Sequence, residues 1–256
     1  MKRFGKILAA IVVLIPLLAF GWLSYSTQKN LASPAEDALA ALVADESVLI
    51  ESGDWLIMRP ATTEPAAGLI LYPGAHCDIR GYAPVLRNIA AQGYLVVAVS
   101  MPFDFAIFAP NRASEVRDAF PEIEQWIIAG HSMGGGMAAR YAFLHQDELA
   151  GLILWDSHPA DSNSLADSEL PVTRIHRATP DGRPAEKYLD KRGLFPPDSQ
   201  WVPIRGGLHM YFGSFVDGGY EEDWEAGIPR DAQQMITTAA TLEALARMVR
   251  RANRDI

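Results

Sequence analysis

From residue 67 onward, continuously apolar segments alternate with segments of helical pattern, and this alternation is the strongest constraint on the fold. An apolar run without polar interruptions is typical of a strand that is covered on both faces. Strands that alternate with helices form a mostly parallel sheet with helices on both sides, so we expect an α/β fold. The predicted strands are 67–73, 94–102, 125–130, 149–157, 171–178 and 200–207, and the predicted helices are 82–93, 111–121, 133–146 and 229–252.

The chain before residue 67 has a different character. Residues 47–52 and 54–61 are apolar runs around a Gly-Asp turn, which predicts an antiparallel hairpin. Residues 27–46 are predicted to be a polar linker followed by a short amphipathic helix. At 256 residues the chain is long enough for one sizeable domain, which we place at 47–256.

The N-terminus, residues 1–26, has the features of a membrane segment. Three basic residues precede an apolar run at 7–23, and no charge returns until Lys29. A spanning helix needs about 20 mostly apolar residues. Trp22 and Tyr25 fall where aromatic side chains meet the membrane interface.

We interpret this segment as an uncleaved anchor, with a cleaved signal peptide as the alternative. A signal peptide has a site of small residues after its apolar core, and residues 31–33 give only a weak match. The basic flank places the N-terminus in the cytoplasm. The domain is therefore expected outside the cytoplasm, either membrane-anchored or, after cleavage, secreted.

Charge and cysteine content exclude several classes of protein. The formal net charge is −9, and basic residues cluster only at the N-terminus, which argues against a nucleic-acid partner. Cys77 is the only cysteine, so neither an intramolecular disulfide nor a cysteine-based metal site can form.

The stretch "IAGHSMGGG" (128–136) joins a predicted strand to a predicted helix. In sheets of this type, functional residues follow the carboxyl ends of strands. The stretch contains G-x-S-x-G, in which flanking glycines allow a serine to occupy a strained turn with its hydroxyl exposed. The alternative is a plain tight turn, but the strand–turn–helix context favours Ser132 as a nucleophile.

A serine nucleophile needs a base, usually a histidine held by a carboxylate. Of the six histidines, His209 alone follows the last predicted strand, and we expect it to be the base. Two aspartates satisfy the chain order Ser, Asp, His. We favour Asp181, because a loop aspartate followed by glycine can turn back over the histidine. Asp156, at the end of strand 149–157, is the alternative acid and is equally suited to capping a following helix.

Two backbone N–H groups are required to bind the negative charge that develops on a carbonyl oxygen. Met133, directly after the nucleophile, is the expected source of one, and Ala75, in the turn after strand 67–73, of the other. Cys77 lies near that turn without an activating partner, so we interpret it as a packing residue.

The segments between the predicted strands leave little room for a lid. Residues 157–171 are too few for a large helical cap, so no large cap domain is expected. The apolar loop 101–110 and the segment 211–228 are candidates for shaping a pocket. Within the latter, "EEDWEAG" (221–227) is interpreted as a solvated loop.

Together these motifs resemble the α/β-hydrolase superfamily and, more closely, bacterial membrane-anchored hydrolases of the "fold-5" type. The stretches that carry the resemblance are "LILYPGAHCDIRGYAP", "GHSMGGGMAA", "ATPDG" and "IRGGLHMYFG". The resemblance implies a triad of Ser132, Asp181 and His209. The chain departs from the group at the acid, where "RATPDG" lacks the glycine and asparagine of the usual G-x-N-D-G approach.

These residues predict hydrolysis of a carboxylic ester through an acyl-enzyme, with a small-molecule substrate and neither a metal nor an organic cofactor. Two alternatives remain at this stage. The same residues suit a thioester or amide bond, and the same fold suits a membrane-tethered binding module without catalysis.

Overall fold

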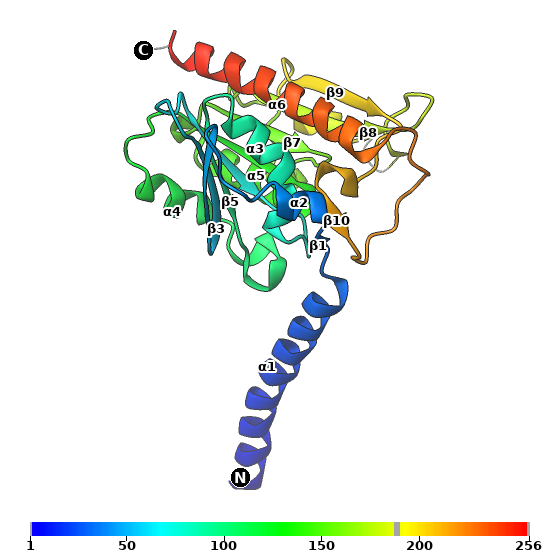
Figure 1. Ribbon diagram of the computed structural model, residues 1–256. Helices are drawn as coiled ribbons and strands as arrows, with labels where there is room; N and C mark the ends of the chain where they lie inside the picture. Colours follow the sequence, from blue (N-terminus) through cyan, green and yellow to red (C-terminus); the bar gives the residue numbers. More distant parts are fainter. Residues whose placement is uncertain (1, 187–189, 255–256) are drawn as a thin grey trace.

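The fold is built on an eight-stranded sheet in the order β2-β3-β5-β4-β6-β7-β8-β9. It is seen in a computed structural model that describes residues 2–186 and 190–254 (Figure 1). All pairings from β5 to β9 are parallel, whereas β2 and β3 are antiparallel additions at one edge. The strands are β2 (Val48–Ser52), β3 (Trp55–Pro60), β4 (Gly68–Tyr72), β5 (Leu95–Val99), β6 (Trp126–His131), β7 (Gly151–Trp155), β8 (Val172–Ala178) and β9 (Gln200–Arg205).

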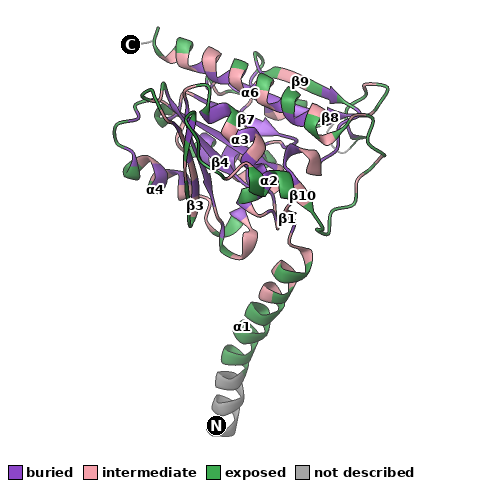
Figure 2. Cartoon of the chain, in the orientation of Figure 1, coloured by how far each residue is buried: buried purple, intermediate pink, exposed green. Residues whose placement is uncertain are grey.

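Four helices cover the two faces of the sheet. Helices α3 (Ala83–Ala90) and α6 (Arg230–Ala252) pack in one hydrophobic cluster, and α4 (Arg112–Ala119) and α5 (Ser132–Leu144) pack in the other. Figure 2 shows the central strands β4, β5, β6, β7 and β8 buried between these layers. The predicted α/β class, the hairpin and the alternation of strands and helices are therefore confirmed.

No large cap covers the sheet within the described residues. Between β7 and β8 the chain forms only one short 3-10 turn, Asp161–Asn163. The loops after β4, β6 and β7 therefore meet at the carboxyl edge of the parallel strands, the edge where sites form in such sheets. In the part of the chain that the structure describes, no helical lid is inserted there after β7.

Helix α1 (Lys2–Asn30) projects from the domain, and the chain after it is fastened to that same edge (Figure 1). Strand β1 (Ser33–Pro34) pairs with β10 (Phe215–Val216). The amide of Ala32 donates to the carbonyl of His76 at 2.7 Å. The segment after α1 therefore lies beside the loop that follows β4, and the short α2 (Glu36–Ala40) continues from it.

The turn between β6 and α5 depends on close backbone contacts at its glycines. A Cβ atom on Gly134 would lie 2.2 Å from the carbonyl oxygen of Pro73, and one on Gly130 would lie 2.5 Å from that of Gly134. Backbone atoms cannot move aside as the end of a side chain can. A Cβ atom on Gly136, two residues further along α5, would lie 3.9 Å from its nearest neighbour, the carbonyl oxygen of His158.

Gly134→Ala should therefore lower the free energy of unfolding by about 1–3 kcal/mol, because the added methyl group overpacks a backbone contact. Gly136→Ala is the matched control, and it should leave stability unchanged or raise it by up to about 1 kcal/mol through helix propensity. Urea unfolding of the detergent-solubilised chain measures both. Equal destabilisation by the two variants would contradict this account of the turn.

Candidate active site

Ser132 lies at the strained point of the β6–α5 turn. Its φ of 53° is in the left-handed region that non-glycine residues rarely adopt. The side chain of Ser157 donates a hydrogen bond to the Ser132 carbonyl at 2.6 Å and so supports this backbone from the neighbouring strand end. Strand β6 thus ends in an elbow that presents a serine, as the G-x-S-x-G pattern predicts.

His209 is buried directly before a 3-10 turn at Met210–Phe212 and contacts Asp156. Its Nδ1 lies 2.6 Å from Oδ2 of Asp156. Because a carboxylate only accepts hydrogen bonds, Nδ1 is the donor. This contact holds the proton on Nδ1 and leaves Nε2 as the basic nitrogen of the neutral ring.

Asp156 follows β7 directly, in the strand order next to the elbow of β6. Its side chain is fully buried, and its φ of 45° turns the chain sharply at the strand end. Burial by itself raises the pKa of this carboxyl. The hydrogen bond from His209 and the positive charges around it outweigh burial, so the pKa of Asp156 lies below its ordinary value.

The structure does not bring Asp181 to His209. Asp181 lies in an exposed turn that closes on itself, since the amide of Thr179 donates to the carbonyl of Arg183 at 2.8 Å. The Asp181 carboxylate accepts hydrogen bonds from Thr179 and, at 2.7 Å, from Nε of Arg183. The expectation that this loop turns back over the histidine is wrong. Asp156 caps no α-helix, because none follows β7 before β8.

Arg177, a fully buried residue of β8, is a second partner of the Asp156 carboxylate. Its Nε donates to Oδ2 of Asp156 at 2.9 Å, and its backbone amide donates to Oδ1 at 3.3 Å. The remaining guanidinium nitrogens reach Glu222 at 3.0 Å and Asp223 at 2.5 Å. One buried cation therefore connects the carboxylate beside His209 with two acidic residues distant in sequence.

Glu222 and Asp223 belong to residues 217–229, which join β10 to α6 and which we call the overlying segment. Glu222 also accepts hydrogen bonds from the backbone amides of His209 and Met210, at 2.9 and 2.7 Å. The ring of Tyr220 stacks on His209 with centroids 4.3 Å apart. The interpretation of 221–227 as a solvated loop is therefore wrong for Glu222, whose carboxylate holds the backbone of His209.

His131, the last residue of β6, ties the histidine turn to the loop after β4. Its Nε2 donates to the carbonyl of His209 at 3.0 Å, and its Nδ1 accepts from the hydroxyl of Tyr82 at 2.8 Å. The Tyr82 hydroxyl in turn accepts from the amide of Gly74 at 3.0 Å. Burial lowers the pKa of His131 well below its ordinary value, so the ring stays neutral and bridges these two segments.

A cavity of about 320 Å³ is lined by Ser132 and His209 together with Ala75, Tyr220 and Asn30, the last residue of α1. Met133 is the second residue of α5, and its amide is among those at a helix start that lack an intrahelical acceptor. The predicted site residues other than Asp181 thus lie in or beside one cavity.

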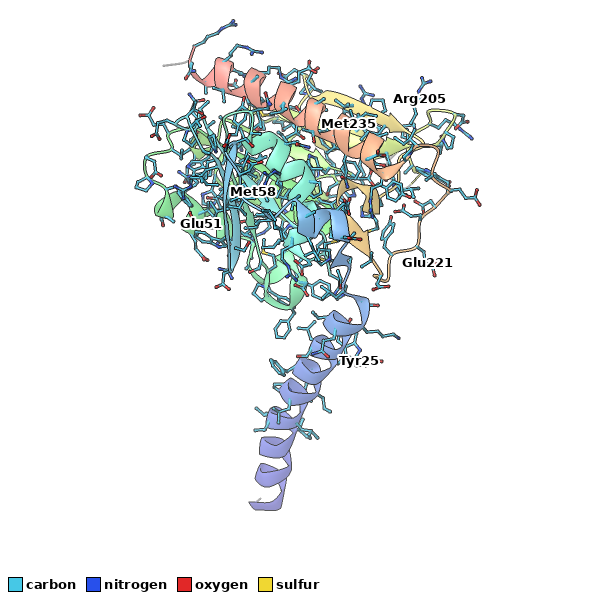
Figure 3. All side chains as sticks on the ribbon, in the orientation of Figure 1. Tyr25, Glu51, Met58, Arg205, Glu221 and Met235 are labelled. Atoms are coloured by element: carbon cyan, nitrogen blue, oxygen red, sulfur yellow. The ribbon has the colours of Figure 1, made fainter. Side chains whose placement is uncertain are left out.

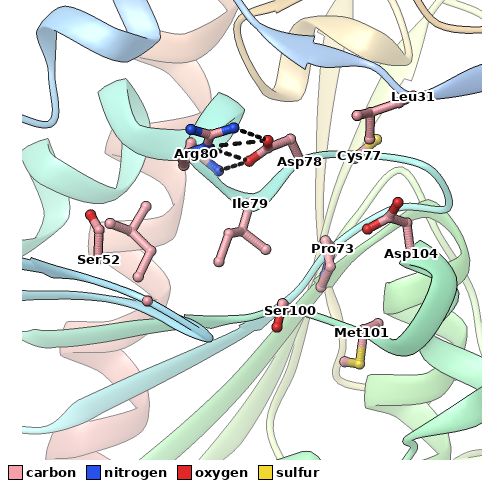
Figure 4. Close-up of a pocket in the computed structure, with 12 residues that line it drawn as sticks. Leu31, Ser52, Pro73, Cys77, Asp78, Ile79, Arg80, Ser100, Met101 and Asp104 are labelled. Atoms are coloured by element: carbon pink, nitrogen blue, oxygen red, sulfur yellow. Dashed lines mark hydrogen bonds and ion pairs between the residues drawn. The ribbon is translucent and has the colours of Figure 1, made fainter. Parts of the chain in front are cut away.

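A second cavity, of about 280 Å³, is shown in Figure 4, and Cys77 lines both cavities. It is lined by Leu31, Met101 and Asp104 and by the ion pair of Asp78 with Arg80 at 2.6 Å. It contains neither Ser132 nor His209.

Cys77 itself is buried, and burial raises the pKa of its thiol to about 12, in keeping with a packing residue. Within residues 2–186 and 190–254, no group of three or more His, Cys, Asp or Glu side chains is placed to hold a metal ion.

A family model described as "Alpha/beta hydrolase family" matches residues 68–235, more than half of the chain. The chain belongs to the alpha/beta hydrolase family.

Solved structures share the fold of this hydrolase at low sequence identity. A soluble variant of monoglyceride lipase from Saccharomyces cerevisiae, in complex with a substrate analog, aligns with a TM-score of 0.54 at 13% identity, over 81% of this chain and 97% of that chain. Est1E from Butyrivibrio proteoclasticus gives 0.54 at 13%, over 78% and 99%. A ferulic acid esterase from Streptomyces cinnamoneus gives 0.50 at 18%, over 75% and 68%.

One curated relative is a protein named as a non-heme haloperoxidase, from Mycobacterium phage D29. It is 27% identical over 106 residues, and the match spans 38% of this hydrolase and 38% of that protein. The aligned part is thus well under two thirds of the relative.

Arg177 is the part of this hydrolase's site that the sequence interpretation missed, although a signal for it exists. Strand 171–178 is predicted to be covered on both faces, yet it carries Arg174 and Arg177. A buried guanidinium requires an acidic partner. This requirement would have pointed to Asp156 and to the acidic run at 221–223 as partners of Arg177.

Arg177→Met should lower the free energy of unfolding by about 3–5 kcal/mol, because it leaves the buried Asp156 carboxylate without its guanidinium partner. Arg183→Met is the matched control, since it removes an exposed arginine from its pair with Asp181, and exposed pairs contribute little. Urea unfolding measures both variants. Equal shifts in the unfolding midpoint would contradict the role given to Arg177.

Proposed function

We propose that this chain is a serine hydrolase of carboxylic esters, which works through a triad of Ser132, His209 and Asp156. The observation that carries the proposal is the 2.6 Å contact between Nδ1 of His209 and the buried Asp156 carboxylate. Ser132 and His209 line the same cavity. A nucleophile, a base and a carboxylate that orients the base are the three parts that acyl transfer by serine requires.

Each side chain has one task in the proposed reaction. Nε2 of His209 takes the proton of the Ser132 hydroxyl as its oxygen attacks the ester carbonyl. The protonated imidazole is then stabilised by the negative charge of Asp156 and returns the proton to the departing alcohol. The resulting acyl-serine is hydrolysed by water, which His209 activates in the same way.

The negative charge that develops on the carbonyl oxygen needs donors that are already in position. The amide of Met133 is suited to this, because it follows the nucleophile at the positive end of α5. Ala75 supplies the second amide from the loop after β4, which lines the same cavity. The hydrogen bonds that link Gly74 to Tyr82, Tyr82 to His131, and His131 to the carbonyl of His209 support the position of this loop relative to His209.

Proteins that share the fold include a monoglyceride lipase and a ferulic acid esterase, and these relatives favour an ester as the substrate. The open carboxyl edge of the sheet, with only a short 3-10 turn between β7 and β8, leaves the cavity without a large lid inserted there.

We also propose that α1 tethers the domain to a membrane, with the domain outside the cytoplasm. The part of α1 from Ile11 to Asn30 is long and apolar enough to span a membrane, a property that it shares with signal sequences. Its exposed apolar side chains, such as Leu18 and Trp22, have no protein surface to cover them. The basic residues before the apolar run orient the domain to the extracytoplasmic side.

Hydrolysis of p-nitrophenyl butyrate by the full chain in detergent tests the triad. Ser132→Ala should reduce kcat/KM to background, because it removes the nucleophile. Asp156→Asn should lower kcat about 10⁴-fold, since the amide no longer holds the imidazole in the required tautomer.

Asp181→Asn is the matched control for the acid, because it makes the same change in an exposed turn. It should leave kcat within about twofold of the native value, as surface substitutions away from a site usually do. Loss of activity in Asp181→Asn with retention in Asp156→Asn would reverse the assignment. Retained turnover in Ser132→Ala would remove the proposed function.

A further inference from the structure

Helix α1 contacts the catalytic domain at its apolar end as well as through the chain that follows it. The ring of Phe20 packs edge to face against Phe103 with centroids 5.5 Å apart. About two helical turns further along α1, the Thr27 hydroxyl donates to the carbonyl of Phe103 at 2.8 Å. The loop after β5 is therefore fastened to the helix at two levels, and Figure 1 shows it at the edge of the domain from which α1 projects.

The contact at Phe20 determines how deep this loop lies if α1 spans a bilayer. The apolar run 7–23 is 17 residues long, and as a helix it measures about 25 Å, slightly less than the hydrocarbon core, which is about 30 Å thick. The whole run is therefore needed to cross the core, so its last residue lies near the headgroups. Phe20 is three residues, or about 4.5 Å, from the end of the run. Phe103, packed against Phe20, then lies at the boundary between headgroups and acyl chains.

The loop presents apolar side chains at this level. Ile107 and Phe108 in the 3-10 turn Ala106–Phe108 are 48% and 50% exposed. Phe108 packs against Phe103 with centroids 6.1 Å apart. Exposed aromatic and aliphatic side chains beside a spanning helix are suited to insertion into the interface.

The same rings lead from the helix to the catalytic cavity. Phe108 packs against Phe105 at 6.0 Å, and Phe105 packs against His76 at 4.5 Å. His76 lines the cavity that contains Ser132. The backbone holds this arrangement, because the amide of His76 donates to the carbonyl of Asp104 at 2.9 Å, and Asp104 has a φ of 57°. We call the rings of Phe103, Phe105 and Phe108 the aromatic ridge.

We propose that the aromatic ridge inserts into the leaflet in which α1 ends and guides lipid esters with long acyl chains from that leaflet to Ser132. The inference rests on the proposed membrane-tethered ester hydrolase and names its substrate class. The acyl chain stays in an apolar environment along the ridge, while the ester group reaches the polar cavity, whose wall includes Asn30 at the end of α1.

The first test measures insertion without reference to activity. Phe108→Cys in the Ser132→Ala chain is labelled with an environment-sensitive nitrobenzoxadiazole dye and placed in phosphatidylcholine vesicles with doxyl-labelled lipid as quencher. Met235→Cys is the control, since Met235 is 71% exposed on α6, far from α1 (Figure 3). The only native cysteine, Cys77, is buried, so unsubstituted protein gives the labelling blank.

The lipid quencher should reduce the fluorescence of the label at position 108 several-fold more than that of the label at position 235. Equal quenching at the two positions would overturn the insertion of the ridge.

The second test measures substrate class as a ratio of two rates. Vesicle-reconstituted protein is given soluble p-nitrophenyl butyrate or p-nitrophenyl palmitate embedded in the bilayer. Phe108→Ser should lower the ratio of palmitate to butyrate turnover about tenfold, the effect expected from the loss of one apolar contact of this size. Met235→Ser should leave the ratio unchanged.

An unchanged ratio in Phe108→Ser, with butyrate still hydrolysed, would overturn the inference while the proposed function stands. If the native chain hydrolyses neither ester, the proposed function fails and the substrate class fails with it. Quenching at position 108 then distinguishes that result from a failure of the ridge to reach the bilayer.

Discussion

The arrangement of the site depends on one buried carboxylate, that of Asp156, which His209 and Arg177 hold from two directions. An isolated ionised carboxylate in the protein interior is strongly unfavourable, so it must be paired or protonated. Here the same Oδ2 atom accepts from Nδ1 of His209 at 2.6 Å and from Nε of Arg177 at 2.9 Å. These bonds keep Asp156 ionised and fix the orientation of the imidazole, which a base for serine requires.

Arg177 extends this constraint beyond Asp156 and His209. Its other nitrogens bind Glu222 and Asp223, so the overlying segment 217–229 is held by the same cation that holds Asp156. Glu222 then accepts from the amide of His209, and His131 donates to the carbonyl of the same residue. The position of the histidine is thus determined through its side chain and both of its backbone polar groups, from β7, β8, the elbow and the overlying segment.

The fold and part of the site were predictable because they depend on local patterns. Continuous apolar runs indicate buried parallel strands, and the glycines around Ser132 indicate an elbow, since a Cβ on Gly134 would meet backbone atoms. The place of His209 after the last strand was also predictable. The carboxylate that contacts it was not, because Asp156 and Asp181 both follow strands and satisfy the same chain order. What separates them is burial and the partner arginine, and these arise only when β7, β8 and the overlying segment come together. The depth of the aromatic ridge likewise depends on a contact between Phe20 and Phe103, 83 positions apart in the sequence.

The central claim is that this environment activates Ser132, and reaction with a fluorophosphonate tests it most directly. Such probes phosphonylate serines that have an activated hydroxyl, and they do so without any assumption about the natural substrate. The full chain in detergent is incubated with the probe, digested and analysed by mass spectrometry, with heat-unfolded protein as the control. The account predicts one adduct, on Ser132, in the folded protein and none after unfolding. Absence of the adduct from the folded chain, or its appearance on a different serine, would contradict the account.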